Sequence, residues 1–202
     1  MTRTQIINGL IAKNNYKSYL EIGINEPSPD TRRWNWTDVQ IETKHGVDPN
    51  VDTTYRMTSD EFFAKHVPQK YDIIFVDGLH LFEQVHRDIL NSLNNLNENG
   101  TIIVHDCNPI HEITQRRERV SAAWHGDVWK AILKLRIEEP FISIDTVDTD
   151  EGCGIIRKGT QELLNPIEIS SSFDIYDYSY LEKHRQKFLN LISIENFVKK
   201  YL

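Results

Sequence analysis

The segment from residue 71 to residue 106 constrains the fold more than any other part of the chain. Two β-prone runs, Tyr71–Val76 and Thr101–Asp106, flank a segment in which apolar residues recur every three or four positions. That spacing places Phe82, Val85, Ile89, Leu93 and Leu96 on one face of a helix, with polar residues such as Asp88 on the other side. A strand, a helix and a strand of these lengths predict a βαβ unit, whose two strands are parallel and joined by a right-handed crossover.

The rest of the chain extends this unit into a sheet. We predict two strands before it, at residues 19–24 and 45–48, and a short helix at residues 60–66. After it we predict a helix that begins near Asp127 as its cap, and an antiparallel hairpin of residues 141–147 and 153–156. The expected fold is therefore α/β: a Rossmann-like, doubly wound and mostly parallel seven-stranded sheet that ends in an antiparallel hairpin. Residues 159–202 form a tail whose last stretch is predicted to be helical.

Length and composition exclude several classes of function. The 202 residues are enough for one well-buried domain, and the net charge of −7 gives no reason to expect binding to nucleic acid or to an anionic membrane. No apolar run approaches the roughly 20 residues of a membrane helix, and the N-terminus lacks the apolar core of a signal peptide. With Cys107 and Cys153 as the only cysteines, we expect a cytoplasmic protein without disulfides.

Polar residues follow the predicted parallel strands at the point where each one ends. Glu21 and Gly23 close the first strand and Asp48 the second, while Asp77 and Asp106 follow the two strands of the βαβ unit. Open α/β sheets bind their ligands at the carboxyl ends of the strands. The sequence therefore predicts a ligand site at this edge.

The turn after the first strand argues against a dinucleotide as the ligand. A dinucleotide site needs a Gly-x-Gly-x-x-Gly turn, but Gly23 is followed by no second or third glycine. Asn25 could adopt a left-handed turn, yet Pro27 and Pro29 disfavour a helix that starts promptly. A ligand with a ribose and no phosphate fits better. Asp48 stands about 25 residues past the turn, where a carboxylate accepts ribose hydroxyls, and S-adenosylmethionine is such a ligand.

The order and spacing of five motifs carry a family resemblance. YLEIGI, GVDPN, MTSDEFF, FVDGLHLFEQVHRDI and GTIIVHDCNP together resemble a class I S-adenosylmethionine-dependent methyltransferase. The likeness is greatest to small bacterial O-methyltransferases related to the catechol-type and macrolide-sugar enzymes, and it runs from about residue 19 to residue 158. Residues 1–158 would then form the cofactor-binding domain. Residues 159–202 would be part of the same domain, a lid or a dimer element.

The resemblance implies a set of cofactor-binding residues. Glu21 and Gly23 would lie beside the methionine part of S-adenosylmethionine, and Asp48 would bind its ribose. Ser59 and Asp60 would lie near the adenine. Asp77 would belong to this set as well as to the catalytic one.

The resemblance also implies a catalytic and metal-binding set. Asp77 and Asp106 match two acids that hold Mg²⁺ in the metal-dependent members, and His80 matches their general base. Where those members often continue with Asn or Asp, this chain has Cys107, which is a poor ligand for a hard cation. Asn108 could substitute for it.

Simple physics supports a functional pair independently of the family. If the strands before Asp77 and Asp106 are neighbours, they lie about 4.8 Å apart. Two carboxylates so close repel each other, so a cation must bridge them or one must take up a proton. A metal would lower the pKa of an acceptor hydroxyl, and a histidine can take its proton.

Each of these residues also has a purely structural interpretation. Asp77 could form a turn and cap the following helix, and His80 could be a surface histidine. His105 is expected to be packed or hydrogen-bonded rather than catalytic. Arg116, Arg117 and Arg119 form a charge run that is usually solvated but could grip an anionic acceptor, and Trp124 and His125 lie in the segment expected to cover the acceptor.

Three functions remain open at this point. The favoured one is O-methylation of a small molecule or sugar-type acceptor, with Mg²⁺ as an open question. The alternatives are a nucleotide-binding Rossmann enzyme, such as a dehydrogenase or sugar-modifying enzyme, and a non-catalytic module that retains the cofactor fold. Apart from these functions, the tail is a candidate for the contacts of a homodimer.

Overall fold

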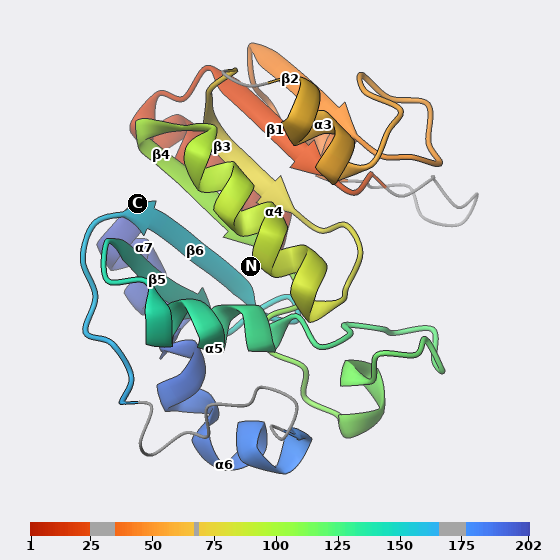
Figure 1. The fold of residues 1–202 in the computed structure, drawn as a ribbon. Coiled ribbons are helices and arrows are strands. Elements are labelled where there is room, and N and C mark those ends of the chain that lie inside the picture. The colour runs from red at the N-terminus through yellow and green to blue at the C-terminus, as the bar shows by residue number, and fades with distance from the viewer. Residues whose placement is uncertain (25–34, 67–68, 166–176) are drawn as a thin grey trace.

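The computed structural model describes residues 1–24, 35–66, 69–165 and 177–202. A seven-stranded sheet runs through it in the order β2-β1-β3-β4-β6-β5-β7 (Figure 1). The first four of these strands are parallel, β6 is antiparallel to both β4 and β5, and β7 is parallel to β5. The predicted mostly parallel sheet with an antiparallel hairpin is confirmed. Its strands are β1 Ser18–Ile22, β2 Thr43–Val47, β3 Tyr71–Val76, β4 Leu96–Val104, β5 Ile142–Val147, β6 Cys153–Lys158 and β7 Leu191–Ile192.

Helices cover both faces of the sheet because side chains alternate along each strand. Ile74 and Val76 of β3 pack on the face covered by α3 Ser59–Lys65, α4 Phe82–Asn94, α5 Trp129–Glu138 and α6 Tyr178–Leu189. Ile73 and Phe75 pack on the other face, against α1 Arg3–Asn14 and α7 Ile194–Tyr201. Figure 1 shows α3, α4 and α5 on the near side of the sheet. Two short helices complete the described elements: α2 Asn35–Asp38 and the 3-10 helix Glu112–Gln115.

Helix α4 differs from its prediction in two ways. It ends at Asn94, and β4 begins at Leu96 rather than at Thr101, so Leu96 belongs to the strand. Asp88 does not lie on a solvated face: it is buried. The apolar spacing identified the helix correctly, but it could not reveal that a polar residue also faces inward.

Asp127 caps a different helix from the one predicted. Helix α5 begins after Val128 and has no side-chain cap. The carboxylate of Asp127 instead accepts a hydrogen bond of 2.8 Å from the backbone N–H of Phe82, the first residue of α4. A capping residue contacted from 45 positions away cannot be assigned from local sequence.

The two ends of the chain contribute more than the sequence analysis assigned to them. Helix α1, for which no element was predicted, starts with a capping box formed by Thr2 and Gln5. The predicted C-terminal helix is two helices, α6 and α7, separated at the left-handed Asn190 by β7, which adds to the edge of the sheet. No helix in the described part of the chain is long and apolar enough to cross a bilayer.

Candidate active site

A cavity of about 660 Å³ opens at the carboxyl ends of β1, β2, β3 and β4. Every residue that the sequence analysis assigned to the site lines this cavity: Glu21, Gly23, Asp48, Ser59, Asp60, Asp77, His80 and Asp106. The strand-end argument thus located the cavity correctly. The sequence analysis missed four lining residues that matter below: Arg3, Gln84, Asp88 and His105.

Gly23 joins the ends of three strands. Its N–H donates to Val47 O of β2 at 2.9 Å, and a Cβ on Gly23 would lie 2.2 Å from the backbone oxygen of Asp77, after β3. Its φ of +86° is a conformation that residues with a side chain rarely adopt. Only glycine allows this close approach of β1 to the loop after β3. The missing second and third glycines concern residues 25–34, so Asn25, Pro27 and Pro29 lie outside the described residues.

Glu21 is a buried carboxyl group held by neutral partners. It accepts a hydrogen bond of 2.7 Å from the hydroxyl of Tyr19, which itself accepts one of 2.9 Å from the side-chain amide of Asn35. Burial raises the pKa of Glu21 to about 7, although these hydrogen bonds act in the opposite direction. The group therefore sits close to its point of titration at neutral pH.

Asp48 uses most of its hydrogen-bonding capacity within the protein. Its Oδ1 accepts from the backbone N–H groups of Asn50, at 2.8 Å, and Val51, at 3.1 Å, and its Oδ2 accepts from that of Ile24 at 3.0 Å. A carboxylate has about four acceptor positions, so one position on Oδ2 is left. Asp48 therefore has room for one further hydroxyl donor, and its role in binding the ribose stays a prediction.

A polar wall lies where α3 faces α4. The amide nitrogen of Gln84 lies 3.1 Å from Ser59 Oγ and from Asp88 Oδ1, and 3.2 Å from Asp60 Oδ1. Burial raises the pKa of Asp88 to about 6. The i, i+4 spacing of Gln84 and Asp88 was the available signal that both belong to one face.

Asp77 and Asp106 meet at His80 on the other side of the cavity. His80 Nε2 lies 3.3 Å from Asp77 Oδ1, and His80 Nδ1 lies 3.2 Å from Asp106 Oδ2. Asp77, His80 and Asp106 form the only group of potential metal ligands found among the described residues. Burial lowers the pKa of His80, but the two carboxylates outweigh it and raise the pKa above its usual value.

The structural interpretations of these residues are not supported. Helix α4 has Leu81 at its N-cap and no side-chain cap, so Asp77 does not cap it. His80 is largely buried: its Nδ1 lies 2.8 Å from the backbone oxygen of Trp124, and its ring stacks on the Trp124 indole with centroids 5.1 Å apart. Asp106 has a φ of +59°, a strained backbone conformation for a non-glycine residue and one that concentrates at functional sites.

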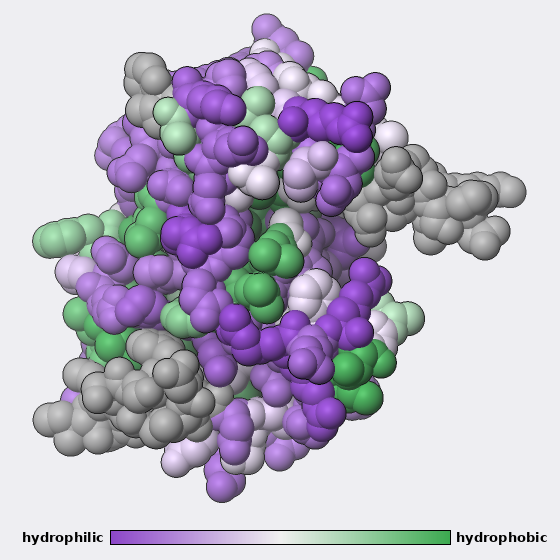
Figure 2. Space-filling view, turned by 45° about the vertical axis from the view of Figure 1, so that its right-hand side comes forward, coloured by the Kyte–Doolittle hydropathy of each residue, from purple (hydrophilic) through white to green (hydrophobic). Residues whose placement is uncertain are grey.

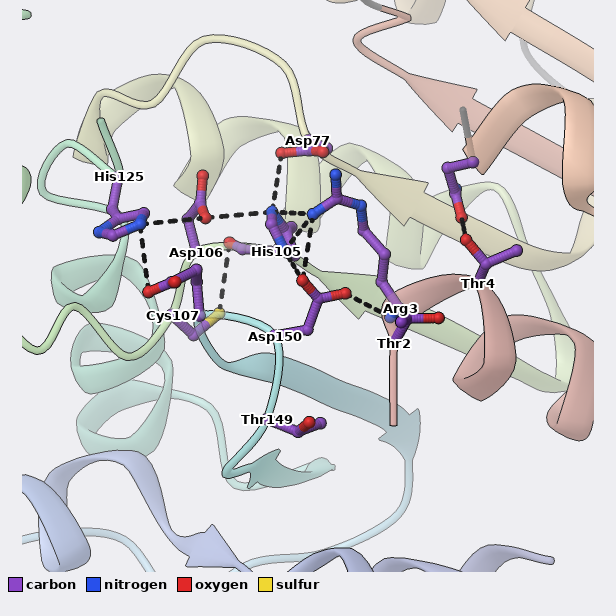
Figure 3. A network of polar contacts seen from close by, with 12 residues as sticks. Thr2, Arg3, Thr4, Asp77, His105, Asp106, Cys107, His125, Thr149 and Asp150 are labelled. Carbon is purple, nitrogen blue, oxygen red and sulfur yellow. Dashed lines mark hydrogen bonds and ion pairs between the residues drawn. The ribbon is translucent and has the colours of Figure 1, made fainter. Parts of the chain in front are cut away.

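A second histidine, His105, contacts both carboxylates, as Figure 3 shows. His105 Nδ1 lies 3.3 Å from Asp77 Oδ1 and 3.1 Å from Asp106 Oδ1, and its Nε2 lies 2.7 Å from Arg3 Nη1. Burial lowers the pKa of His105, but the charges of Asp77 and Asp106 outweigh it and raise that pKa well above its usual value, so His105 presents an N–H and a positive charge to the carboxylates. Arg3 is in turn held by Asp150, in the turn between β5 and β6. His105 is thus packed and hydrogen-bonded, as the sequence indicated.

This network sets the protonation of Asp77. Burial alone would raise its pKa, but the contacts with His105 and His80 outweigh burial and lower the pKa below the usual value. Asp77 is therefore ionised, in contrast to Glu21 on the neighbouring strand.

The residues that follow Asp106 contribute no metal ligand. Cys107 is fully buried and its thiol donates to Val104 O at 3.3 Å, and burial raises its pKa. The amide of Asn108 donates to Asp148 at 2.9 Å and its oxygen accepts from Arg185 of α6, so Asn108 does not substitute. A divalent cation here would be held by the carboxylates of Asp77 and Asp106, with the His80 ring as the third donor in reach.

Comparison with known proteins agrees with this geometry. A family model described as a methyltransferase domain matches residues 8–107, about half of the chain and all four parallel strands that surround the cavity. The chain belongs to the class I S-adenosylmethionine-dependent methyltransferases. The matched region ends at Cys107, directly after the second carboxylate of the pair.

Solved structures share the fold of this methyltransferase at low sequence identity. A proposed caffeoyl-CoA O-methyltransferase from Staphylococcus aureus is 18% identical, with 77% of this chain and 82% of that chain covered and a TM-score of 0.55. A proposed O-methyltransferase from Klebsiella pneumoniae is 13% identical, with coverages of 78% and 80% and a TM-score of 0.56. The O-methyltransferase from Bacillus cereus in complex with S-adenosylhomocysteine (SAH) is 14% identical, with coverages of 78% and 82% and a TM-score of 0.51. No curated protein matches the chain significantly.

Proposed function

We propose that this methyltransferase transfers the methyl group of S-adenosylmethionine to a hydroxyl oxygen of a small-molecule or sugar-type acceptor. The observation that carries the proposal is the pair Asp77 and Asp106 with His80 between them, at the edge of a cavity that also contains Glu21 and Asp48. The names of the structurally similar O-methyltransferases support the same chemistry.

The cofactor would lie along the carboxyl ends of β1, β2 and β3. Glu21 and Gly23 line the part of the cavity suited to the methionine moiety, where a bound ammonium group would favour the ionised form of Glu21. The free acceptor position on Asp48 Oδ2 would take one ribose hydroxyl. The wall of Ser59 and Asp60 would lie beside the adenine, and Asp77 would face the sulfonium centre with its negative charge.

The reaction would be a direct displacement. The acceptor oxygen attacks the methyl carbon in line, an O–C bond forms while the S–C bond breaks, and SAH leaves with the electron pair of the broken bond. The acceptor proton passes to His80, whose ring lies at the site and has its Nδ1 anchored at Trp124 O. Asp77 and Asp106 stabilise the imidazolium that results, because their charges lie within 3.3 Å of the ring.

We propose that Asp77 and Asp106 can also hold Mg²⁺ or another divalent cation. A bound cation would lower the pKa of the acceptor hydroxyl. The fit is incomplete for Mg²⁺, which prefers oxygen donors, because neither Cys107 nor Asn108 supplies one. A cytoplasmic location and a homodimer remain predictions.

The test is methyl transfer from radiolabelled S-adenosylmethionine to a panel of hydroxylated acceptors. Replacing the base should lower turnover by about 10²–10⁴-fold, so we expect such a loss in His80→Ala and a comparable one in Asp106→Asn, with SAH affinity within a few-fold of wild type. His184→Ala, at an exposed histidine of α6, is the matched control. Full turnover in both site variants would contradict the proposed mechanism.

A further inference from the structure

We infer that the methyl acceptor carries an anionic group, a carboxylate or a phosphate, and that Arg119 binds it while Trp124 supports the part that carries the hydroxyl. The inference rests on the proposed function and names the substrate class of the same cavity. Its starting point is a difference among three arginines that the sequence could not separate.

Two of the three arginines are committed to partners on the protein surface. Arg116 forms an ion pair of 3.0 Å with Glu112, one helical turn away. Arg117 bridges Glu83, at 2.9 Å, and the buried Asp127, at 2.6 Å, and so ties its loop to the start of α4. Neither of them lines the cavity. Both therefore fit the structural interpretation of a solvated charge run.

Arg119 is different in both respects. It lines the cavity, and it makes no hydrogen bond or ion pair with any residue that the structure describes. The other arginine of the cavity wall, Arg3, is held by His105 and Asp150. Among the described lining residues, Arg119 is thus the one permanent cation without an acidic partner.

Arg119 is exposed, and the other charged residues that line the cavity are mainly acidic. Six carboxyl groups line it: Glu21, Asp48, Asp60, Asp77, Asp88 and Asp106. The one anionic group of the proposed cofactor is its methionine carboxylate, which would lie with the methionine part beside Glu21 and Gly23; its adenosine and sulfonium parts carry no negative charge. An anion that approaches the acceptor end would meet repulsion from Asp77 and Asp106 unless a cation balanced it, and Arg119 is placed to do so.

The residues next to Arg119 suit a flat acceptor. Trp124 follows on the same loop, and its position is fixed because its indole N–H donates to Arg116 O at 2.7 Å while its ring stacks on His80. Leu79, beside His80, also lines the cavity although its side chain is 50% exposed. Figure 2 shows a face that is mostly hydrophilic, with hydrophobic side chains in small separate patches. The His80 ring, the Trp124 indole stacked on it and the Arg119 guanidinium therefore line one cavity.

The test titrates the SAH-saturated full chain with two matched pairs of probes by calorimetry. The pairs are 3,4-dihydroxybenzoate with its methyl ester, and glucose 6-phosphate with glucose. In wild type we expect the anionic member of at least one pair to bind about ten to a hundredfold more tightly than its neutral partner. The pair that shows the preference tells whether the group is a carboxylate or a phosphate.

The variants decide whether Arg119 is responsible. Arg119→Gln should abolish the preference for the anion, Arg119→Lys should retain part of it, and Arg116→Gln, three positions away on the same loop, should leave it unchanged. Equal affinity for anionic and neutral probes, no binding of either anion, or a preference that survives Arg119→Gln would overturn the inference. SAH binding is measured first in every sample: its absence from wild type would refute the proposed function, whereas intact SAH binding without an anion preference would refute the inference alone.

Discussion

Glu21 and Asp77 stand on adjacent strands, yet their surroundings push their pKa values in opposite directions. The hydrogen-bond donors that Glu21 contacts among the described residues are neutral, and burial raises its pKa to about 7. Asp77 is less deeply buried, it faces His80 and His105, and its pKa falls below the usual value. Two carboxyl groups in one cavity thus acquire different pKa values from their surroundings, a common way to divide roles in an active site.

The same contrast extends to the two ends of the cavity. At the ends of β1 and β2, acids are held by backbone N–H groups and hydroxyls, which position them without adding charge. At the ends of β3 and β4, they are held by histidines that Arg3 and Trp124 keep in place. Neutral partners around Glu21 and Asp48 suit the binding of a cofactor. Charged partners that can carry a proton, around Asp77 and Asp106, suit the reaction. The following predictions test that division.

The largest expected effect concerns Gly23, where the two ends meet. In Gly23→Ala the new Cβ would lie 2.2 Å from the backbone oxygen of Asp77 at a φ of +86°. Strain and overlap together should cost about 3 kcal/mol or more of unfolding free energy. Gly78→Ala is the matched control, because its Cβ would meet its nearest neighbour at an ordinary 3.5 Å. Chemical denaturation of both variants measures the difference. Equal stabilities would show that the close approach of β1 to the loop after β3 does not require glycine at position 23.

The second effect follows from the pKa of Glu21. Its folded value of about 7 lies above the usual 4.5, so between these pH values the folded state keeps a proton that the unfolded state has lost. The stability that Glu21 contributes is present at pH 4.5 and lost as the pH rises through 7, by about 3 kcal/mol in total. Urea unfolding should therefore show that the unfolding free energy falls less between pH 5 and pH 8 in Glu21→Gln than in wild type. Asp88→Asn, at a group whose pKa is about 6, measures the separate contribution of that residue. If the unfolding free energy of Glu21→Gln fell with pH as much as that of wild type, the raised pKa of Glu21 would be contradicted.

The smallest effect concerns Arg3 of α1, which contacts His105, the histidine beside Asp77 and Asp106. Arg3→Met removes the contacts with His105 and Asp150 but keeps an unbranched side chain. We expect the unfolding free energy to fall by about 1–2 kcal/mol. Turnover should fall while SAH affinity stays close to wild type, because Arg3 acts through His105 on the carboxylate pair. Lys13→Met, at an exposed position of the same helix, controls for the loss of a charge. If SAH affinity fell more than turnover, Arg3 would belong to the cofactor end instead.

The sequence predicted the sheet and the location of the cavity well because both follow from local patterns. Apolar runs define β1 and β3, and an acid after a parallel strand must lie at the edge where the other strands end. It could not predict contacts made across the chain. Arg3 reaches His105 from 102 positions away, and Asp127 caps a helix that precedes it by 45. Asp48 lines the cavity, but the three backbone donors that occupy it belong to loops whose shape no local pattern reveals.

The central claim is that this cavity binds S-adenosylmethionine, and titration of the purified chain with SAH tests it most directly. Calorimetry with and without Mg²⁺ should show one site of micromolar Kd in wild type and in His80→Ala alike. Binding of Mg²⁺ that Asp106→Asn removes would assign the metal to the carboxylate pair. No detectable SAH binding at millimolar concentration in either condition would contradict the account.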